Sequence, residues 1–236
     1  MRQSNNLSIS IVIPVLNEEG YIGNVLKHLK ETSNPNIIKE IICVDGGSSD
    51  KTMRVAADFG AVVIQSKKGR ARQMNFGAKH VKGEILYFLH ADTLTPKNFD
   101  TIIVDAIREG HESGCFRMQF DTKNPILRFF AYLSRINHTL CRGGDQSLFI
   151  RRELFDKTQG FNEDYLIYED TEFITRLYQH TKFKVLSEAV VTSARKYREK
   201  GWVRIQFHFG MIHLKNYFGA GPKELFRYYS KHILNG

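Results

Sequence analysis

The sequence predicts an α/β protein with a doubly wound, mostly parallel sheet, helices on both faces and a C-terminal helical appendage. In residues 7–110, four short and almost wholly apolar runs alternate with segments of helical periodicity. Strands buried on both faces of a parallel sheet have this apolar character, and the helices between them supply the crossovers. The 236 residues have room for one such domain with an appendage.

Residues 7–110 contain four units, each of a strand and a helix. We expect Asn17 to cap the first helix, because asparagine is a favoured N-cap and the acids Glu18 and Glu19 then suit the helix dipole. Pro96 begins the fourth helix, since proline is accepted in a first helical turn. The expected strands are residues 8–14, 37–45, 61–65 and 84–89, and the expected helices are residues 17–31, 49–59, 69–80 and 96–108.

The second half of the chain is less regular, and no internal repeat or low-complexity linker interrupts it. We expect strands at 114–120 and 146–150, helices at 125–137 and 168–178, and two brief strands near Phe183 and Val190. From Trp202 onward the periodicity is helical and strongly aromatic. The sequence therefore predicts a domain of residues 1–194, made of halves 7–110 and 111–194, and a tail of residues 195–236.

Composition excludes several classes of protein. With 42% hydrophobic residues the chain is ordinary for a globular protein, which excludes disorder as its main state. No run approaches the roughly 20 apolar residues that span a bilayer, and residues 1–6 lead into the first strand without a signal-peptide core. The three cysteines are odd in number and lack C-x-x-C spacing, so we expect reduced thiols and a cytoplasmic protein.

The positive charge is concentrated in the tail. The chain carries 34 Lys and Arg and 25 Asp and Glu, a net charge of +9, and residues 195–236 contain nine Lys or Arg and two Glu. Nucleic acid, a membrane surface or a phosphorylated substrate could be the anionic partner. No nucleic-acid-binding module is recognisable, so we expect no nucleic acid.

Acidic residues follow three of the expected strands. Since ligands gather at the carboxyl ends of strands in open α/β sheets, Asp45 and Asp92 are candidates for a binding site. Asp45 suits a base N–H or a ribose hydroxyl, and Asp92 suits Mg²⁺ or Mn²⁺ bridging a diphosphate. Neither G-x-G-x-x-G nor a P-loop is present, which disfavours NAD and a P-loop nucleotide site. The alternative for each aspartate alone is a turn or helix cap.

Three segments together resemble glycosyltransferase family 2, the GT-A fold enzymes that use nucleotide-sugar donors. They are residues 11–19 (IVIPVLNEE), 42–52 (ICVDGGSSDKT) and 69–78 (GRARQMNFGA). The resemblance implies that residues 7–110 bind the nucleotide sugar, with a uridine nucleotide preferred and Asp45 as the partner of the base. The residues it implies for donor binding are Pro14, Leu16, Asn17, Glu18, Asp45, Gly69, Arg70, Arg72, Asn75, Ala91 and Asp92.

The metal motif departs from the family's D-x-D pattern and reads His90-Ala91-Asp92. By resemblance Asp92 remains the direct ligand of Mg²⁺ or Mn²⁺. His90 has three alternative roles: a metal ligand, a phosphate contact, or a packed histidine. The continuation H-A-D-T, together with G-R-A-R-Q-M-N, resembles a bacterial subgroup of the family.

Residues 111–194 resemble the family's acceptor half. Gly144, Asp145 and Gln146 match its acceptor side, and the pair Glu169-Asp170 matches its catalytic acids. We expect Asp170 to be the base of an inverting transfer and Glu169 to tune its surroundings. The alternative is that these acids complement a helix dipole.

Two other functions remain open from the sequence. A sugar nucleotidyltransferase can share this topology, but it needs a basic, glycine-rich loop where residues 16–19 are acidic. An inactive GT-A domain that serves as a membrane adaptor would not need the three aspartates. The family's processive Q-x-x-R-W motif is absent, which favours the addition of a single sugar.

The tail has three alternative roles: packing on the protein's own core, contact in a homo-oligomer, or peripheral membrane binding. A helical wheel over residues 202–218 places Arg204, His208 and Lys215 on one stripe, with apolar residues on most of the remainder. A basic and aromatic pattern continues to residue 231 and suits anionic headgroups. A lipid-linked acceptor at the inner face of the membrane is consistent with this pattern.

Overall fold

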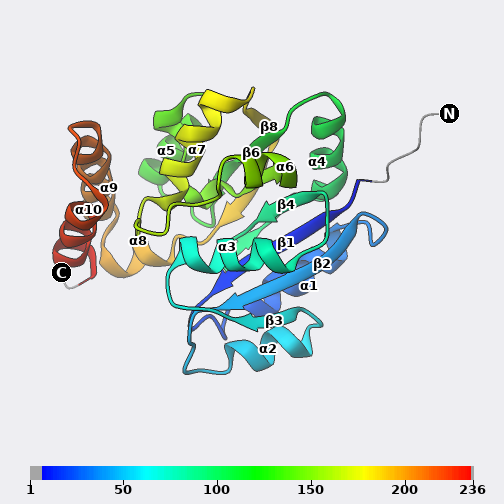
Figure 1. Cartoon of the computed structure of the whole chain (residues 1–236). Coiled ribbons are helices and arrows are strands. Elements are labelled where there is room, and N and C mark those ends of the chain that lie inside the picture. The colour runs from blue at the N-terminus through cyan, green and yellow to red at the C-terminus, as the bar shows by residue number, and fades with distance from the viewer. Residues whose placement is uncertain (1–6, 235–236) are drawn as a thin grey trace.

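The computed structural model describes residues 7–234 and shows one mixed sheet of eight strands (Figure 1). The strand order is β3-β2-β1-β4-β7-β6-β8-β5. Four of the seven pairings are parallel, those of β1 with β2 and β4, of β2 with β3, and of β6 with β8. The predicted mostly parallel α/β fold is therefore confirmed. Residues 1–6, on which we based the absence of a signal peptide, lie outside the described part of the chain.

The strands are β1 (Ile9–Val15), β2 (Ile38–Asp45), β3 (Val62–Gln65), β4 (Ile85–Phe88), β5 (Thr93–Leu94), β6 (Ser113–Phe120), β7 (Leu148–Arg151) and β8 (Lys184–Thr192). The α-helices are α1 (Ile22–Thr32), α2 (Thr52–Asp58), α3 (Arg70–His80), α4 (Phe99–Arg108), α5 (Pro125–Leu133), α6 (Arg152–Lys157), α7 (Glu169–His180), α8 (Arg195–Lys200), α9 (Trp202–Tyr217) and α10 (Pro222–Tyr229). Two short 3-10 helices, η1 (Thr139–Cys141) and η2 (Gly144–Gln146), and a π-helical turn, η3 (Ser230–Leu234), complete the described chain.

The helices cover both faces of the sheet because side chains alternate along each strand. On β1, Ile11 and Ile13 join a core with helices α1, α2 and α4. Val12, between them, joins the opposite core with α3, α6 and α7. Every β1 side chain is buried, which explains the unbroken apolar run in the sequence.

Several details differ from the expected elements. The fourth helix begins at Phe99, after Asn98 in the left-handed conformation, so the prediction that it begins at Pro96 is wrong. The short elements β5 and α6 were not predicted. The first helix begins at Ile22 with no side-chain cap, and Asn17 has a φ of 54°, so the prediction of Asn17 as its N-cap is wrong. Residues 17–21 form a loop in place of the expected first helical turn, and side chains of this loop bond to the loop after β2. The two brief strands near Phe183 and Val190 are one strand, β8, because both ends pair with β6 across a register shift. The helix expected at 125–137 ends at Leu133.

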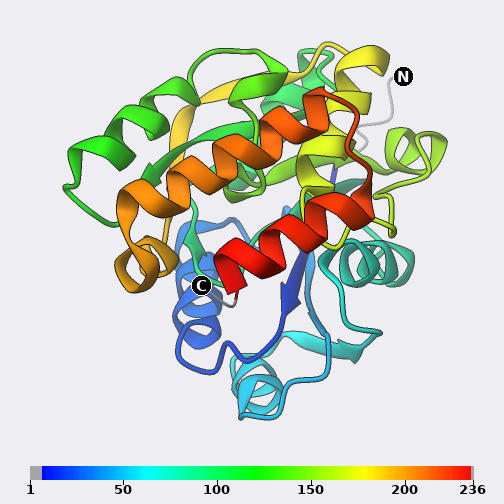
Figure 2. The same ribbon diagram turned by 90° about the vertical axis from the view of Figure 1, so that its left-hand side faces the viewer.

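A third core joins the tail to the rest of the protein. Leu127 of α5 and Ala194 pack with Ile205 and Ile212 of α9 and Leu225 of α10. Figure 1 shows α9 and α10 at one end of the molecule, and Figure 2 shows them lying against each other across the side where β1 ends. The expected thiols are confirmed as well: Cys43 and Cys115 are buried and Cys141 is half-buried, and all three are free.

Candidate functional site

The loops that follow β1 and β2 are bonded together. The Asn17 side chain accepts a hydrogen bond from Ser49 N at 2.9 Å, and Asn17 N donates to Ser48 Oγ at 2.9 Å. Glu18 N donates to Thr52 Oγ1 at 2.7 Å. The left-handed conformation of Asn17 is one that asparagine tolerates better than most residues, and it aims both groups at the β2 loop. Asn17 therefore shapes a double loop at the carboxyl edge of the sheet.

Asp45, the last residue of β2, presents an unused acceptor at this edge. Its Oδ2 accepts hydrogen bonds from Gly47 N at 2.8 Å and Ser48 N at 3.0 Å. Its Oδ1 is buried and has no hydrogen-bond partner within residues 7–234. A buried carboxylate oxygen without a partner is costly. A ligand N–H or hydroxyl at this position would remove that cost.

Gln73 of α3 supports the same edge, and the sequence analysis did not single it out. Its buried amide donates to Val15 O at 2.9 Å and to Val44 O at 2.7 Å, at the ends of β1 and β2. A Cβ on Gly46 would lie 2.9 Å from Gln73 Oε1, so only glycine leaves room for this amide. In the sequence, Gln73 could have been recognised as a polar residue on the otherwise apolar buried face of α3.

Asp92 and Glu18 share one cation, Arg195. The Arg195 guanidinium donates to the two Glu18 carboxylate oxygens at 3.0 and 3.2 Å, and its Nη2 lies 3.6 Å from Asp92 Oδ2. The same guanidinium lies 4.3 Å from the centroid of the Tyr21 ring. Sequence reasoning missed Arg195, because 103 positions separate it from Asp92 and no local pattern links them.

Arg70 gathers the acids of the second half of the chain. It follows Gly69, the residue that precedes α3, and its Nε lies 3.1 Å from Glu169 Oε1. Its Nη2 lies 3.2 Å from Asp170 Oδ2 and 2.6 Å from His90 Nδ1. The structure thus brings together Arg70, His90, Glu169 and Asp170, which the sequence analysis selected from separate segments. This arrangement gives His90 a contact with Arg70.

Burial and charge shift the pKa values of these groups. Burial raises the pKa of Glu169 to about 7, and the positive charge of Arg70 opposes this shift. Burial also raises the pKa of Asp170, again against Arg70 and with Asp145 adding to the rise. Burial lowers the pKa of Arg70, but the surrounding acids outweigh burial and raise it. Near neutral pH the pair can therefore take up a proton, as a general base must.

The surroundings of Asp92 fit a divalent cation. Burial raises the pKa of Asp92 to about 6, and the negative charges of Asp145 and Glu18 raise it further, against Arg195 and Arg70. A cation would relieve this concentration of negative charge. Within residues 7–234 no three His, Cys, Asp or Glu side chains converge as a ligand cluster. Mg²⁺ often uses only one or two carboxylates and completes its shell with water and substrate phosphates, so Asp92 suffices.

Some residues predicted for the site make other contacts. Asn75 bonds the backbone of Phe161 through both side-chain atoms, and Arg72 lies 3.8 Å from Glu163, so both face the loop before α7. Gln146 is buried and accepts from Arg142 at 2.9 Å. Its neighbour Asp145 is exposed at its side chain and acts on the site through charge. Pro14 and Ala91 are buried and Leu16 is half-buried beside the same edge, and Gly144 lies in η2.

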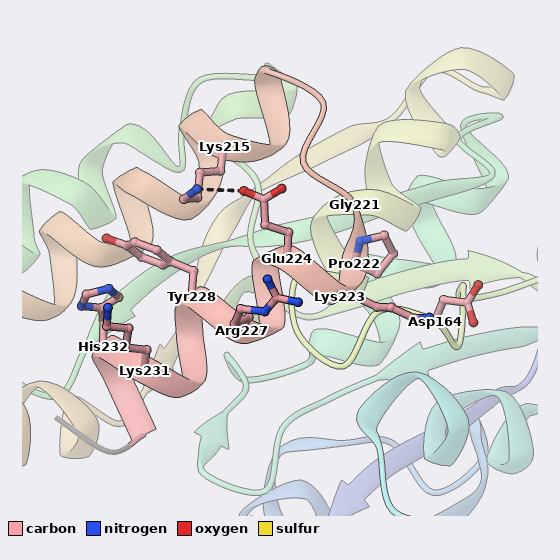
Figure 3. A pocket seen from close by; sticks show the side chains of 10 residues that line it. All are labelled: Asp164, Lys215, Gly221, Pro222, Lys223, Glu224, Arg227, Tyr228, Lys231 and His232. Carbon is pink, nitrogen blue, oxygen red and sulfur yellow. Dashed lines mark hydrogen bonds and ion pairs between the residues drawn. The ribbon is translucent and has the colours of Figure 1, made fainter.

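A groove of about 830 Å³ lies along α10, and neither Asp92, Glu169 nor Asp170 lines it. Figure 3 shows the residues that line it, on α10 and the turn before it, on η3, at the end of α9 and on the loop that carries Asp164. Lys215 in this groove lies 2.9 Å from Glu224. The groove carries a positive charge because its lining includes Lys215, Lys223, Arg227 and Lys231 against two acids.

The chain belongs to glycosyl transferase family 2, whose profile matches residues 10–167. Among curated relatives, the probable glycosyltransferase YdaM of Bacillus subtilis is 26% identical over 203 residues, which cover 74% of this chain and 48% of YdaM. An undecaprenyl-phosphate 4-deoxy-4-formamido-L-arabinose transferase of Edwardsiella ictaluri is 27% identical over 113 residues, 44% of this chain and 35% of that protein. The chain thus spans less than half the length of these relatives.

Solved structures show the same GT-A fold. The mannosyltransferase PcManGT from Pyrobaculum calidifontis, in complex with GDP-Man and Mn²⁺, superposes with a TM-score of 0.69 at 18% identity. That match covers 96% of this chain and 70% of PcManGT. S. aureus TarS in complex with UDP has a TM-score of 0.67 at 19% identity, over 79% of this chain and 60% of that one. Together these comparisons show that the chain belongs to glycosyl transferase family 2 and has the GT-A fold.

Proposed function

We propose that this protein transfers one sugar from a nucleoside-diphosphate sugar, a uridine nucleotide by preference, to an acceptor hydroxyl with inversion. The observation that supports this most is the convergence of three strand-end and helix-start acids, Asp45, Asp92 and Asp170, along one edge of the sheet. Contacts link Asp45 to Asp92, since the Asp45 loop bonds Asn17, the adjacent Glu18 pairs with Arg195, and Arg195 approaches Asp92. Asp170 is linked to the same segment through Arg70, which contacts both Asp170 and His90. Related folds with UDP and with UDP-GlcNAc bound support this donor class.

The donor side uses groups from both loops. Asp45 Oδ1 would accept a hydrogen bond from the base or the ribose, because this buried oxygen lacks a partner. Asp92 would hold Mg²⁺ or Mn²⁺, which neutralises the diphosphate charge that builds up as the sugar leaves. Arg70 and Arg195 lie beside Asp92 and would pair with the diphosphate oxygens.

The acceptor side uses the acids at the start of α7. The acceptor oxygen attacks the anomeric carbon, the bond from that carbon to the diphosphate oxygen breaks, and the hydroxyl proton passes to Asp170. Arg70 orients the Asp170 carboxylate, and Glu169 pairs with the same guanidinium. A base opposite the leaving group produces inversion at the anomeric carbon.

The acceptor proposed here is lipid-linked and reached at the cytoplasmic face of a membrane. A relative is named for undecaprenyl phosphate, and the positively charged groove along α10 suits a phosphate-bearing acceptor. No helix within residues 7–234 is long and apolar enough to cross a membrane. The division into residues 7–110 for the donor, 111–194 for the acceptor and 195–236 as the tail follows from the same proposal, as does membership of the H-A-D-T subgroup.

Calorimetry with UDP, GDP, CDP and dTDP, each with and without Mn²⁺, tests the donor site. We expect metal-dependent binding of one nucleotide, strongest for UDP, and its loss in Asp92→Asn. The variant Asp170→Asn should bind the nucleotide like the wild type and lose about 10²- to 10⁴-fold in transfer rate, as the removal of a general base does. Absence of binding to any nucleotide would contradict the proposal and favour an inactive adaptor.

A further inference from the structure

Helix α9 turns its polar stripe toward the protein. Arg204 donates to His232 O at 3.3 Å, His208 Nδ1 lies 2.8 Å from Tyr228 Oη, and Lys215 pairs with Glu224 at 2.9 Å. All three partners belong to α10 or η3. The three polar residues that the helical wheel places on one stripe therefore hold the neighbouring α10 and η3.

The opposite side of α9 presents apolar residues to solvent. Ile205 and Ile212 face the core, whereas Val203, Phe207, Leu214 and Tyr217 are exposed. Their spacing of four, seven and three positions keeps them on one helix face. Phe207 is 61% exposed and Tyr217 is 78% exposed, so this face is uncovered in the single chain.

Helix α5 and the turns after it carry a second exposed apolar row. Its members are Phe129, Tyr132, Ile136 and Leu140. Leu127, on the inner side of α5, packs in one core with the two buried isoleucines of α9. Figure 2 shows α5 and α9 on the same side of the molecule, which is also the side where β1 ends.

These two segments contain no acidic residue. Residues 122–144 and residues 200–223 include neither Asp nor Glu, although the chain has 25 acids in 236 residues. At the average frequency of Asp and Glu in this chain, two segments of this combined length would contain about five acidic residues. The same segments contain eight Lys or Arg, and three exposed ones, Lys123, Arg128 and Arg135, flank the apolar row of α5.

We propose that the outward faces of α5 and α9 form one docking surface for an anionic lipid bilayer. The docking surface is defined by the four exposed residues of each row, Phe129, Tyr132, Ile136 and Leu140 with Val203, Phe207, Leu214 and Tyr217. Aromatic and aliphatic side chains enter the headgroup boundary, while the flanking cations contact anionic headgroups. The proposal rests on the lipid-linked acceptor of the proposed function, and the docking surface lies on the side of the molecule where β1 ends.

Charge distinguishes a bilayer from a second copy of the chain. A symmetric dimer through this surface would place two acid-free, cationic segments opposite each other. Like charges at such an interface repel, and no acid within the two segments offsets them. An anionic bilayer has the opposite charge and needs no matching pocket.

Flotation of the full chain with vesicles tests the docking surface. Vesicles of phosphatidylcholine alone are compared with vesicles that contain about 30% phosphatidylglycerol, at low and at high salt. We expect binding to the anionic vesicles that weakens with salt, because screening reduces headgroup attraction. Equal binding to neutral vesicles, or binding to neither, would overturn the proposal.

Variants locate the contact. The triple variant Phe207→Ser, Leu214→Ser, Tyr217→Ser and the double variant Phe129→Ser, Tyr132→Ser should each lower vesicle affinity at least tenfold. Val62→Ser, an equally apolar and exposed position on the edge strand β3, should leave it unchanged. Wild-type vesicle affinity in both surface variants would overturn the proposal.

Two further measurements distinguish the docking surface from the proposed function and from dimerisation. Each variant should bind UDP with Mn²⁺ like the wild type, which shows that it is folded. If no chain binds a nucleotide and vesicle binding is nonetheless lost in the surface variants, the proposed function fails and the docking surface stands. Light scattering that finds a dimer, dissociated by the α9 variant, would overturn the bilayer as the occupant in favour of a second copy.

Discussion

Arg195 and Asp92 lie 3.6 Å apart, although one opens the C-terminal tail and the other ends the donor half of the sheet. The same guanidinium donates two hydrogen bonds to Glu18. The tail is thus joined to the proposed donor site at its first residue. A metal cation that binds Asp92 therefore competes with the positive charge of Arg195.

Replacement of Arg195 separates its effect on the metal from its effect on the nucleotide. In Arg195→Ala we expect Mn²⁺ alone to bind about fivefold more tightly, because the competing charge of a half-exposed pair is worth up to roughly 1 kcal/mol. UDP binding in the presence of Mn²⁺ should weaken. Calorimetry measures both. Arg198→Ala is the matched control, because Arg198 lies on the same helix, α8, and pairs with Asp121 after β6. A lower Mn²⁺ affinity in Arg195→Ala would contradict this prediction.

Asp45→Asn tests the contact to the base. Its one amide oxygen must stay on Gly47 N and Ser48 N, which turns the NH₂ group toward the position of Oδ1. A donor would then face a ligand donor, so we expect UDP affinity to fall at least tenfold, about 1.4 kcal/mol. Calorimetry is the measurement. Asp105→Asn, an exposed aspartate on α4, should bind UDP normally, and equal affinity in both variants would refute the contact.

The pH dependence of transfer reports on Arg70. A general base must be ionised, so the transfer rate rises with pH through the pKa of the base, Asp170, which burial raises from its ordinary value. Arg70 lowers the pKa of both Glu169 and Asp170. In Arg70→Ala the acidic limb of the kcat profile should therefore move to higher pH. Arg72→Ala, on the same helix, should leave the limb in place, and a limb that moves to lower pH in Arg70→Ala would exclude this role.

Gly77 sets the distance between α3 and the sheet. A Cβ at this position would lie 2.5 Å from Val12 Cγ1 and 2.8 Å from Val44 Cγ2. Gly77→Ala should lower the free energy of unfolding by about 1–3 kcal/mol, the usual cost of an overpacked core. Gly210→Ala, on the exposed face of α9 with open space around it, should raise it by about 0.5–1 kcal/mol. Urea denaturation measures both, and equal stability of the two variants would contradict the close packing.

Much of the sheet could be predicted because burial leaves a local record. β1 is buried on both faces, so its apolar run was visible in the sequence. The predicted start of the first helix at Asn17 was wrong because it depends on a contact that leaves no local record in the sequence. A cap depends on backbone conformation as well as residue type, and the side chain of Asn17 bonds to Ser49, 32 positions away. The pairing of β8 with β6 also depends on partners that no local pattern identifies.

The sequence by itself determined the alternating strands and helices of residues 7–110 and the family, and it selected Asp45, Asp92, Glu169 and Asp170 as candidate site residues, since these depend on short patterns of burial and spacing. Only the tertiary structure decided that Arg195 reaches Asp92, that Asn75 bonds the Phe161 backbone, and which face of α9 remains exposed. These contacts join residues separated by tens of positions or more, so they follow from how the helices pack on the sheet. In α9, the polar stripe packs against α10 and η3 because its side chains form hydrogen bonds and an ion pair there. The apolar stripe therefore remains exposed to solvent.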